Sequence, residues 1–158
     1  YGFPSILGAK IGCPDTPVIG FAGDGAFGIS MSEMSSCARK EWPKITMVIF
    51  RNYQWGAEKR NSILWFDNNF VGTELDPELS FAKVANACGL KGITVKTMEE
   101  TTKTIKQSCE DQKNGITTFI EIILNQELGE PFRRDAMKKP VEVAGINKKD
   151  MKPQKSLV

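Results

Sequence analysis

Short apolar runs alternate along this chain with segments whose apolar residues recur at helical spacing, and this alternation limits the folds open to it. Residues 17–22 and 45–50 are largely apolar over successive positions, as in strands buried on both faces of a parallel sheet. Between them, apolar residues recur at helical spacing over residues 27–38, which predicts a helix that ends near Trp42 and Pro43. Strand, helix and strand in this order predict an α/β fold, a parallel sheet with helices on both faces.

The second half of the chain continues the same pattern. Residues 81–88 predict a short helix, with Ser80 as its N-cap and Gly89 just past its end. Residues 92–95 and 117–124 are rich in β-branched residues and predict two further strands.

A longer helix is expected between those two strands. Thr97 and Glu100 have the spacing of a capping box, so the helix should begin there and end near Asn114. Residues 51–79 combine asparagine, glycine and aromatic residues, which predicts a long loop. Because ligands of parallel sheets bind at the carboxyl ends of the strands, the ends of the first two strands are where a site is expected.

The composition is that of a soluble globular protein, with 41% apolar and 25% charged residues. A net charge of +2 gives no reason to expect nucleic acid or a membrane surface as a partner, and no apolar run reaches the roughly 18 residues that span a bilayer. Residues 138–155 carry six lysines, for which a solvated tail is favoured over a binding arm. We therefore expect one domain over residues 1–146 and a basic tail over residues 147–158.

Cysteine and histidine usage narrows the chemistry. The four cysteines are isolated and lack the spacing of a metal site, and the absence of histidine excludes zinc sites and histidine-based triads. Reduced thiols, together with the lack of a signal-like segment over residues 1–10, predict a cytoplasmic protein. The chain begins at Tyr1, without a methionine, inside a segment that favours a helix, so we expect a fragment of a longer protein.

The residues that carry chemistry follow the first two strands. Gly23, Asp24, Gly25 and Ala26 end the first, and Asn52 ends the second. Each motif alone is more often a structural turn, but consecutive parallel strands bring their carboxyl ends together. Carboxylate and amide oxygens suit Mg²⁺, which takes its other ligands from phosphate and water, while glycines let the backbone approach a phosphate. The pair therefore predicts a site for a metal and a diphosphate.

The spacing resembles a known motif, because Gly-Asp-Gly followed after 26 residues by asparagine is similar to the motif of thiamine-diphosphate-dependent enzymes. The resemblance implies thiamine diphosphate and Mg²⁺ as cofactors. It implies that Asp24 and Asn52 bind the metal through their side chains, and Gln54 through its main-chain carbonyl. It also places cofactor contacts along residues 23–26 and at Asn52, Gln54, Trp55 and Gly56.

Longer strings narrow the resemblance. Residues 1–10 are similar to the helix before the Gly-Asp-Gly strand in the acetolactate-synthase superfamily. Residues 50–61, 64–66, 69–75 and 125–140 resemble the sulfoacetaldehyde acetyltransferase family, and the likeness extends to about residue 146. The family converts sulfoacetaldehyde and phosphate to acetyl phosphate and sulfite.

Other functions stay open at this point. The alternatives within the superfamily are acetolactate synthase and a sulfopyruvate or phosphonopyruvate decarboxylase, which a product assay separates. A flavodoxin-like nucleotide-binding module is less favoured, because residues 23–28 lack the spacing of a glycine-rich phosphate loop.

Both implied substrates are anions, so cationic side chains are expected near them. The candidates are Arg51, Lys59, Arg60, Arg133 and Arg134. Arg51 adjoins the predicted metal ligand and is the best placed, although a surface salt bridge at the strand end is an equal alternative. For Arg133 and Arg134, a solvated turn is favoured.

The resemblance also implies missing parts. The glutamate that activates the aminopyrimidine ring lies on a separate pyrimidine-binding domain in this superfamily, and we find no such domain in these residues. The first strand and helix of the diphosphate-binding domain are likewise expected to be absent. Because relatives bind the cofactor between this domain of one subunit and the pyrimidine domain of another, a homodimer or homotetramer is expected, and the chain alone should be inactive.

Overall fold

The computed structural model of this protein describes residues 1–126. They divide into two compact units. The first unit contains Tyr1–Tyr53 and Asp76–Asn125, and the second contains Gln54–Leu75 and, of the described residues, Gln126. The predicted boundary between residues 146 and 147, and the basic tail, lie outside the described residues.

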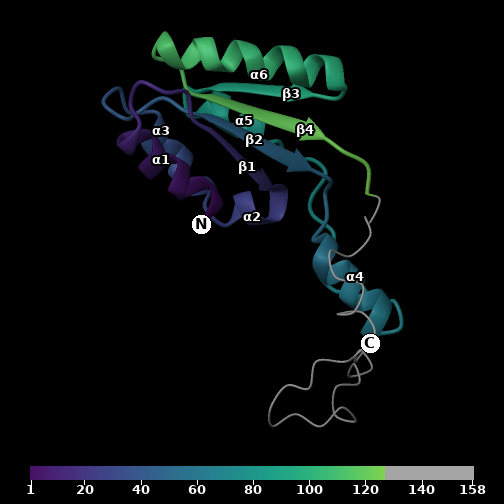
Figure 1. The fold of residues 1–158 in the computed structure, drawn as a ribbon. Coiled ribbons are helices and arrows are strands. Elements are labelled where there is room, and N and C mark those ends of the chain that lie inside the picture. The colour runs from purple at the N-terminus through teal and green to yellow at the C-terminus, as the bar shows by residue number, and fades with distance from the viewer. Residues whose placement is uncertain (127–158) are drawn as a thin grey trace, which may run out of the picture. The chain divides into compact units, whose positions relative to one another are not determined.

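The first unit is built on a parallel four-stranded sheet, which confirms the predicted α/β class (Figure 1). Along the chain the strands are β1 (Ile19–Gly23), β2 (Thr46–Arg51), β3 (Lys91–Val95) and β4 (Thr118–Ile123), and their order in the sheet is β1-β2-β4-β3. β1 and β2 are in register so that Gly23 lies opposite Phe50. The residues that follow both strands therefore emerge together at one edge.

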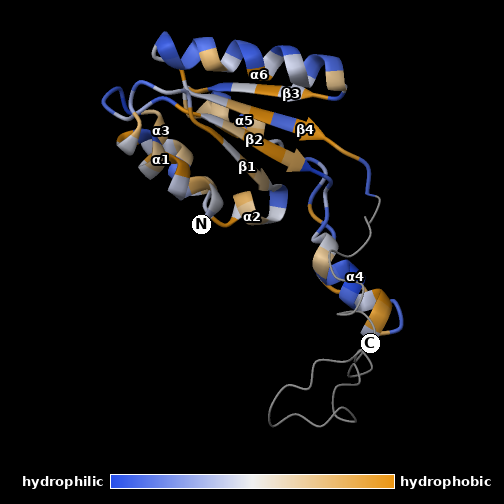
Figure 2. Ribbon diagram, in the orientation of Figure 1, coloured by the Kyte–Doolittle hydropathy of each residue, from blue (hydrophilic) through white to orange (hydrophobic). Residues whose placement is uncertain are grey.

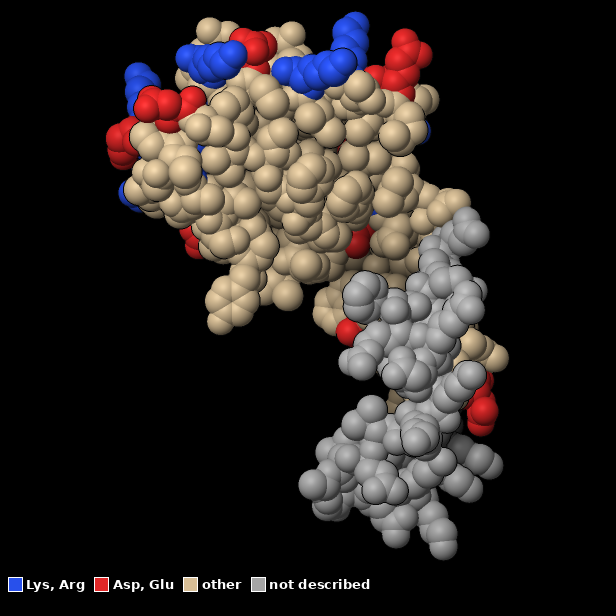
Figure 3. Space-filling view, viewed as in Figure 1, with Lys and Arg blue, Asp and Glu red and all other residues tan. Residues whose placement is uncertain are grey.

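Helices cover both faces of this sheet, as predicted (Figure 1). One face packs against α1 (Gly2–Gly12), α2 (Asp24–Gly28), α3 (Met34–Cys37) and α5 (Phe81–Ala87), and α6 (Met98–Lys113) packs on the other. The first face buries a cluster of aromatic rings, contributed by Phe3, Phe27, Phe81 and Phe119. The second buries aliphatic residues around Val48 and Ile120. The outer side of α6 is hydrophilic, and charged side chains gather over it (Figures 2 and 3).

Several local predictions are confirmed. The capping box of Thr97 and Glu100 is present at the start of α6. Ser80 caps α5 by accepting a hydrogen bond from the Lys83 N–H, and Gly89 follows that helix with a φ of 78°. These signals are local in sequence, so they can be recognised without knowledge of tertiary contacts.

Two predictions are wrong. The single helix expected from Phe27 to near Trp42 and Pro43 is instead broken into α2, the 3₁₀ turn η1 (Met31–Glu33) and α3, which ends at Cys37. The reason is that Gly28 and Ser30 interrupt a stretch in which only the apolar spacing is helical. The loop expected over residues 51–79 contains α4 (Gly56–Trp65). Of the α4 residues only Ser62 is buried, so the helix has no apolar stripe that a sequence pattern could reveal.

Gly92 sets how closely α5 approaches the sheet. A Cβ atom at this position would lie 2.0 Å from the backbone oxygen of Ala82. Only glycine therefore allows α5 to pack directly on β3. Within residues 1–126, no helix is long and apolar enough to cross a membrane.

Candidate functional site

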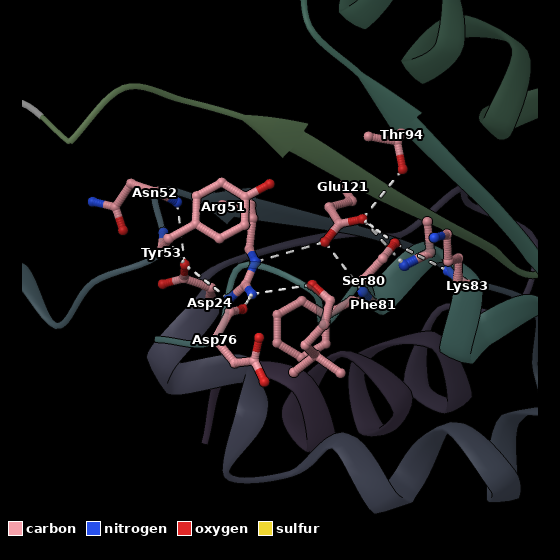
Figure 4. Close-up of polar contacts among 12 residues, drawn as sticks. Asp24, Arg51, Asn52, Tyr53, Asp76, Ser80, Phe81, Lys83, Thr94 and Glu121 are labelled. Carbon is pink, nitrogen blue, oxygen red and sulfur yellow. Dashed lines mark hydrogen bonds and ion pairs between the residues drawn. The ribbon is translucent and has the colours of Figure 1, made fainter. Parts of the chain in front are cut away.

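Asp24 joins the ends of the first two strands. Its side chain is buried at the start of α2, directly after β1. Its Oδ2 accepts hydrogen bonds from the backbone N–H groups of Asn52 (3.1 Å) and Tyr53 (2.8 Å), which follow β2, while Oδ1 accepts one from the Gly25 N–H at 2.8 Å. The structure thus brings Asp24 and the Asn52 backbone together, as the parallel arrangement predicts (Figure 4).

Arg51, the last residue of β2, lies against this carboxylate. Its side chain is fully buried, and Nη1 donates to Asp24 Oδ2 at 3.3 Å. Nη2 donates to the backbone carbonyls of Asp76 (2.6 Å) and Leu79 (3.1 Å). Nε lies 3.8 Å from Glu121 Oε1, which is within ion-pair range but too long for a hydrogen bond, so Nε has no hydrogen-bond partner among the described residues.

The position of Arg51 differs from the surface salt bridge considered from the sequence. The guanidinium is buried and lies against the rings of Tyr53 and Phe81, whose centroids are 4.3 Å and 5.1 Å from Cζ. The reason is the alternation of β2: Met47, Ile49 and Arg51 all point to the face that carries the aromatic cluster. The predicted contact between Arg51 and a substrate anion stays a prediction.

Glu121 is a buried carboxylate that the sequence analysis missed. It lies on β4, and 1% of its surface is exposed. It accepts hydrogen bonds from the Ser80 hydroxyl (2.7 Å), the Phe81 N–H (3.1 Å) and the Thr94 hydroxyl (3.2 Å) (Figure 4). The available signal was a charged residue inside an otherwise apolar buried strand, since such a residue requires buried partners.

The surroundings of Asp24 fit a metal and a diphosphate. Oδ2 is held by protein donors, whereas Oδ1 accepts a single hydrogen bond and keeps capacity for a further ligand. In Figure 4 the side-chain amide of Asn52 and the guanidinium of Arg51 lie on opposite sides of the Asp24 carboxylate. Beside Gly23 there is open space, because a Cβ there would meet no atom within 4 Å.

The set of donors also limits the kind of metal. Within residues 1–126, no group of three or more histidine, cysteine, aspartate or glutamate residues could hold an ion. One carboxylate and one amide suit Mg²⁺, which keeps water ligands and binds through substrate phosphates, better than a metal that needs an all-protein cage. The residues present therefore fit a Mg²⁺–diphosphate group.

The other predicted site residues fall in the second unit or outside the described residues. Gln54, Trp55, Gly56, Lys59 and Arg60 are part of the second unit. There, Gln54 is buried and its Nε2 donates to the Gln126 carbonyl at 2.9 Å, while Lys59 forms an ion pair with Glu74. Their predicted contacts with metal, cofactor and substrate stay predictions. Arg133 and Arg134 lie outside the described residues.

The fold and this site define a class of protein, and the comparisons with known proteins agree. Residues 1–122 match the family described as "Thiamine pyrophosphate enzyme, C-terminal TPP binding domain". The chain belongs to this family. A solved structure described as a thiamine diphosphate-dependent 4-hydroxybenzoylformate decarboxylase from Rhodococcus jostii RHA1 is 25% identical, with a TM-score of 0.69 over 81% of this chain and 23% of that one.

Two relatives resemble the chain much more closely in sequence. A protein of Rhizobium meliloti (strain 1021) named "Probable sulfoacetaldehyde acetyltransferase" is 71% identical over 99% of this chain and 27% of that protein. The "Sulfoacetaldehyde acetyltransferase" of Roseovarius nubinhibens is 66% identical over 98% of this chain and 26% of that protein. The chain thus spans about a quarter of the length of these curated relatives.

Proposed function

We propose that this chain is the diphosphate-binding part of a longer thiamine-diphosphate-dependent acetyltransferase, which converts sulfoacetaldehyde and phosphate to acetyl phosphate and sulfite. The observation that carries the proposal is the carboxylate of Asp24, fixed where β1 and β2 end, in a chain that is 71% identical to a protein named for this activity. Acetolactate synthase and the sulfopyruvate or phosphonopyruvate decarboxylases are less favoured, because both relatives described above carry the acetyltransferase name.

Asp24, Asn52 and Gln54 are proposed to hold the Mg²⁺ ion. Asp24 would contribute Oδ1, Asn52 its amide oxygen and Gln54 its main-chain carbonyl. Residues 23–26, with Trp55 and Gly56, would contact the cofactor, and the open space beside Gly23 supports an approach of the diphosphate to the backbone. Thiamine diphosphate held there would supply a nucleophilic carbon for reaction with the carbonyl of the substrate.

The anionic substrates need cationic partners, and Lys59, Arg60, Arg133 and Arg134 remain the proposed ones. Of these, Lys59 is engaged with Glu74 within the second unit, so it would have to exchange partners to bind an anion.

We also propose that the pyrimidine-binding domain of another subunit completes the site in a homodimer or homotetramer. A cytoplasmic location is supported by four cysteines without disulfide-framework spacing.

The metal assignment is tested by Asp24→Ala and Asn52→Ala in the full-length polypeptide that contains this chain. Asp24→Ala should abolish Mg²⁺-dependent binding of thiamine diphosphate, because a charged ligand is lost. Asn52→Ala should weaken the binding strongly but less, because its ligand is neutral. Calorimetry with thiamine diphosphate at saturating Mg²⁺ measures both, with Asp111→Asn, at the opposite end of the sheet, as the control. Unchanged affinity in both variants would remove the assignment.

The reaction class needs a separate assay. Formation of acetyl phosphate and sulfite from sulfoacetaldehyde and phosphate is expected from the full-length polypeptide, and none from the 158-residue chain alone. Release of carbon dioxide from a 2-oxo acid without acetyl phosphate would instead establish one of the alternatives.

A further inference from the structure

Arg51 and Glu121 are two buried charged residues to which the proposed function assigns no role. We propose that Arg51, backed by Glu121, is a positioning residue that fixes the Asp24 carboxylate for the metal. This inference rests on the proposed function, because the metal site is part of it. It replaces the substrate-binding role that adjacency in sequence suggested for Arg51.

The first support is the charge arrangement. Asp24 at the start of α2, Arg51 at the end of β2 and Glu121 on β4 come from three elements, and each is at most 3% exposed. The guanidinium lies between the two carboxylates, 3.3 Å from Asp24 Oδ2 and 3.8 Å from Glu121 Oε1. Without Arg51, two carboxylates would remain buried without the cation that balances them, which is a costly state.

The second support is which oxygen of Asp24 is held. Oδ2 accepts from the backbone amides of Asn52 and Tyr53 and from the side chain of Arg51. Any residue at positions 52 and 53 other than proline would supply those backbone donors, so Arg51 is the donor that depends on residue identity. Holding Oδ2 fixes the plane of the carboxylate and leaves Oδ1 as the oxygen for a metal.

The third support is what else Arg51 holds. Its Nη2 binds the carbonyls of Asp76 and Leu79, and its backbone oxygen accepts the Leu124 N–H at 2.8 Å. The chain leaves the first unit after Tyr53, re-enters it at Asp76 and leaves it again after Asn125. Arg51 thus contacts the chain where it re-enters the first unit, at Asp76, and one residue before Asn125, as well as contacting Asp24.

Glu121 can support Arg51 because hydrogen bonds fix the orientation of its carboxylate. The Ser80 hydroxyl and the Phe81 N–H, at the start of α5, hold its two oxygens. The negative charge that faces Arg51 Nε is therefore fixed, and it acts on Asp24 only through Arg51. A purely stabilising pair would affect folding alone, whereas a positioning pair also changes metal affinity.

The test measures Mg²⁺ affinity by calorimetry at saturating thiamine diphosphate in the full-length polypeptide, and melting temperature without metal. Arg51→Met should raise the Kd for Mg²⁺ about 10–100-fold, the usual effect of removing a residue that orients a metal ligand. Glu121→Gln should raise it less. Arg51→Lys should fall between Arg51→Met and wild type, because it keeps the charge but loses the planar fork.

Two further variants separate positioning from stability. Arg51→Met combined with Glu121→Gln should have the Kd of Arg51→Met alone, because Glu121 acts through Arg51. Lys91→Met removes the ion pair of Lys91 with Asp111 at the other end of the sheet, and it should leave the Kd within about twofold of wild type while lowering the melting temperature.

The outcomes are distinguishable. If wild-type protein binds Mg²⁺ and thiamine diphosphate, and the Arg51 and Glu121 variants melt lower but keep the wild-type Kd, the positioning role is wrong and the proposed function stands. If wild type binds neither, the proposed function itself fails. Should Arg51→Met not fold, Arg51→Lys and Glu121→Gln decide alone, and an unchanged Kd in both overturns the inference.

Discussion

The two ends of the sheet carry polar clusters of different design. The carboxyl-end cluster consists of Asp24, Arg51 and Glu121. The amino-end cluster consists of Lys91, Asp111, Gln112 and Thr118, together with Thr46 and Val18. Both clusters join several elements of the first unit, but they treat charge differently.

The amino-end cluster fastens one helix to the starts of the strands. Asp111 on α6 accepts hydrogen bonds from Lys91 (2.6 Å) and Thr118 (3.3 Å), which begin β3 and β4. Gln112 bonds both backbone groups of Val18 at 3.0 Å and the Thr46 hydroxyl at 2.8 Å. The cation of this cluster, Lys91, has more than one-third of its side chain exposed, so water still solvates its charge.

In the carboxyl-end cluster, the cation is not solvated in this way. Its cation is buried between two buried carboxylates, and Arg51 Nε has no hydrogen-bond partner among the described residues. Replacing a buried ion pair by apolar residues is often neutral or stabilising, so stability alone does not account for this arrangement. The comparison indicates that the amino end serves assembly, whereas the carboxyl end holds an arrangement suited to a cationic ligand.

The largest expected difference between the two clusters is in how much the free energy of unfolding falls when the cation of each is removed. Arg51→Met should cost about 3–5 kcal/mol, because it leaves two buried carboxylates without their cation. Lys91→Met should cost about 1 kcal/mol or less, because the lysine is partly solvated. Urea unfolding of the metal-free protein measures both, and equal costs would show that the two clusters do not differ in kind.

A double variant serves as the control for that interpretation. Glu121→Gln in the Arg51→Met background should recover part of the lost stability, because it removes one of the stranded charges. If the two costs simply add, desolvated charge is not the cause of the destabilisation.

The amino-end cluster should also make stability depend on pH, through the carboxyl group of Asp111. Burial raises the pKa of the Asp111 carboxyl, but hydrogen bonds from Lys91, Gln107 and Thr118 and the charge of Lys91 outweigh it, so the pKa lies below its usual value. A lowered pKa in the folded state contributes stability above the unfolded pKa of about 3.9, and that stability is lost as the pH falls through the folded value.

Asp111→Asn should therefore destabilise the protein by about 1.5–3 kcal/mol near pH 6, the worth of hydrogen bonds to a charged group. The difference from wild type should shrink as the pH falls below about 4. Urea unfolding at a series of pH values provides the measurement. A difference that stays constant down to about pH 2 would contradict the assigned cause.

The sequence predicted what is local or periodic. The run that forms β2 is apolar on successive residues, and the capping box of Thr97 and Glu100 is complete within four residues, so both are recognisable without tertiary knowledge. The proximity of Asp24 and Asn52 follows from consecutive parallel strands ending at the same edge.

The features that could not be predicted from the sequence depend on which face of the sheet a side chain points to and on what packs against that face. Arg51 follows two positions after Ile49 and so joins the buried face, but the chain leaves the sheet at that point and no pattern continues to fix the face. Glu121 was hidden by its apolar neighbours, because its partners at the start of α5 are about 40 residues away. α4 escaped because it buries little.

The smallest expected effect comes from a matched pair of threonines. Thr118 donates to Asp111 at 3.3 Å from a fully buried position, and Thr94 donates to Glu121 at 3.2 Å from an exposed one. Valine preserves the shape of either side chain and removes only the hydroxyl. Thr118→Val should cost about 1 kcal/mol, the usual net value of a hydrogen bond.

Thr94→Val should cost about 0.5 kcal/mol or less, because water can reach the exposed position and Glu121 keeps its hydrogen bonds from Ser80 and Phe81. Thermal and urea unfolding of the two variants together give the ratio. A larger cost for Thr94→Val than for Thr118→Val would mean that Glu121 depends on its most exposed partner. The carboxylate would then not be fixed from α5 alone, and Arg51 would face a charge that can move. That result would weaken the contrast between the two ends of the sheet, because the charges of the carboxyl-end cluster would no longer be fixed in position.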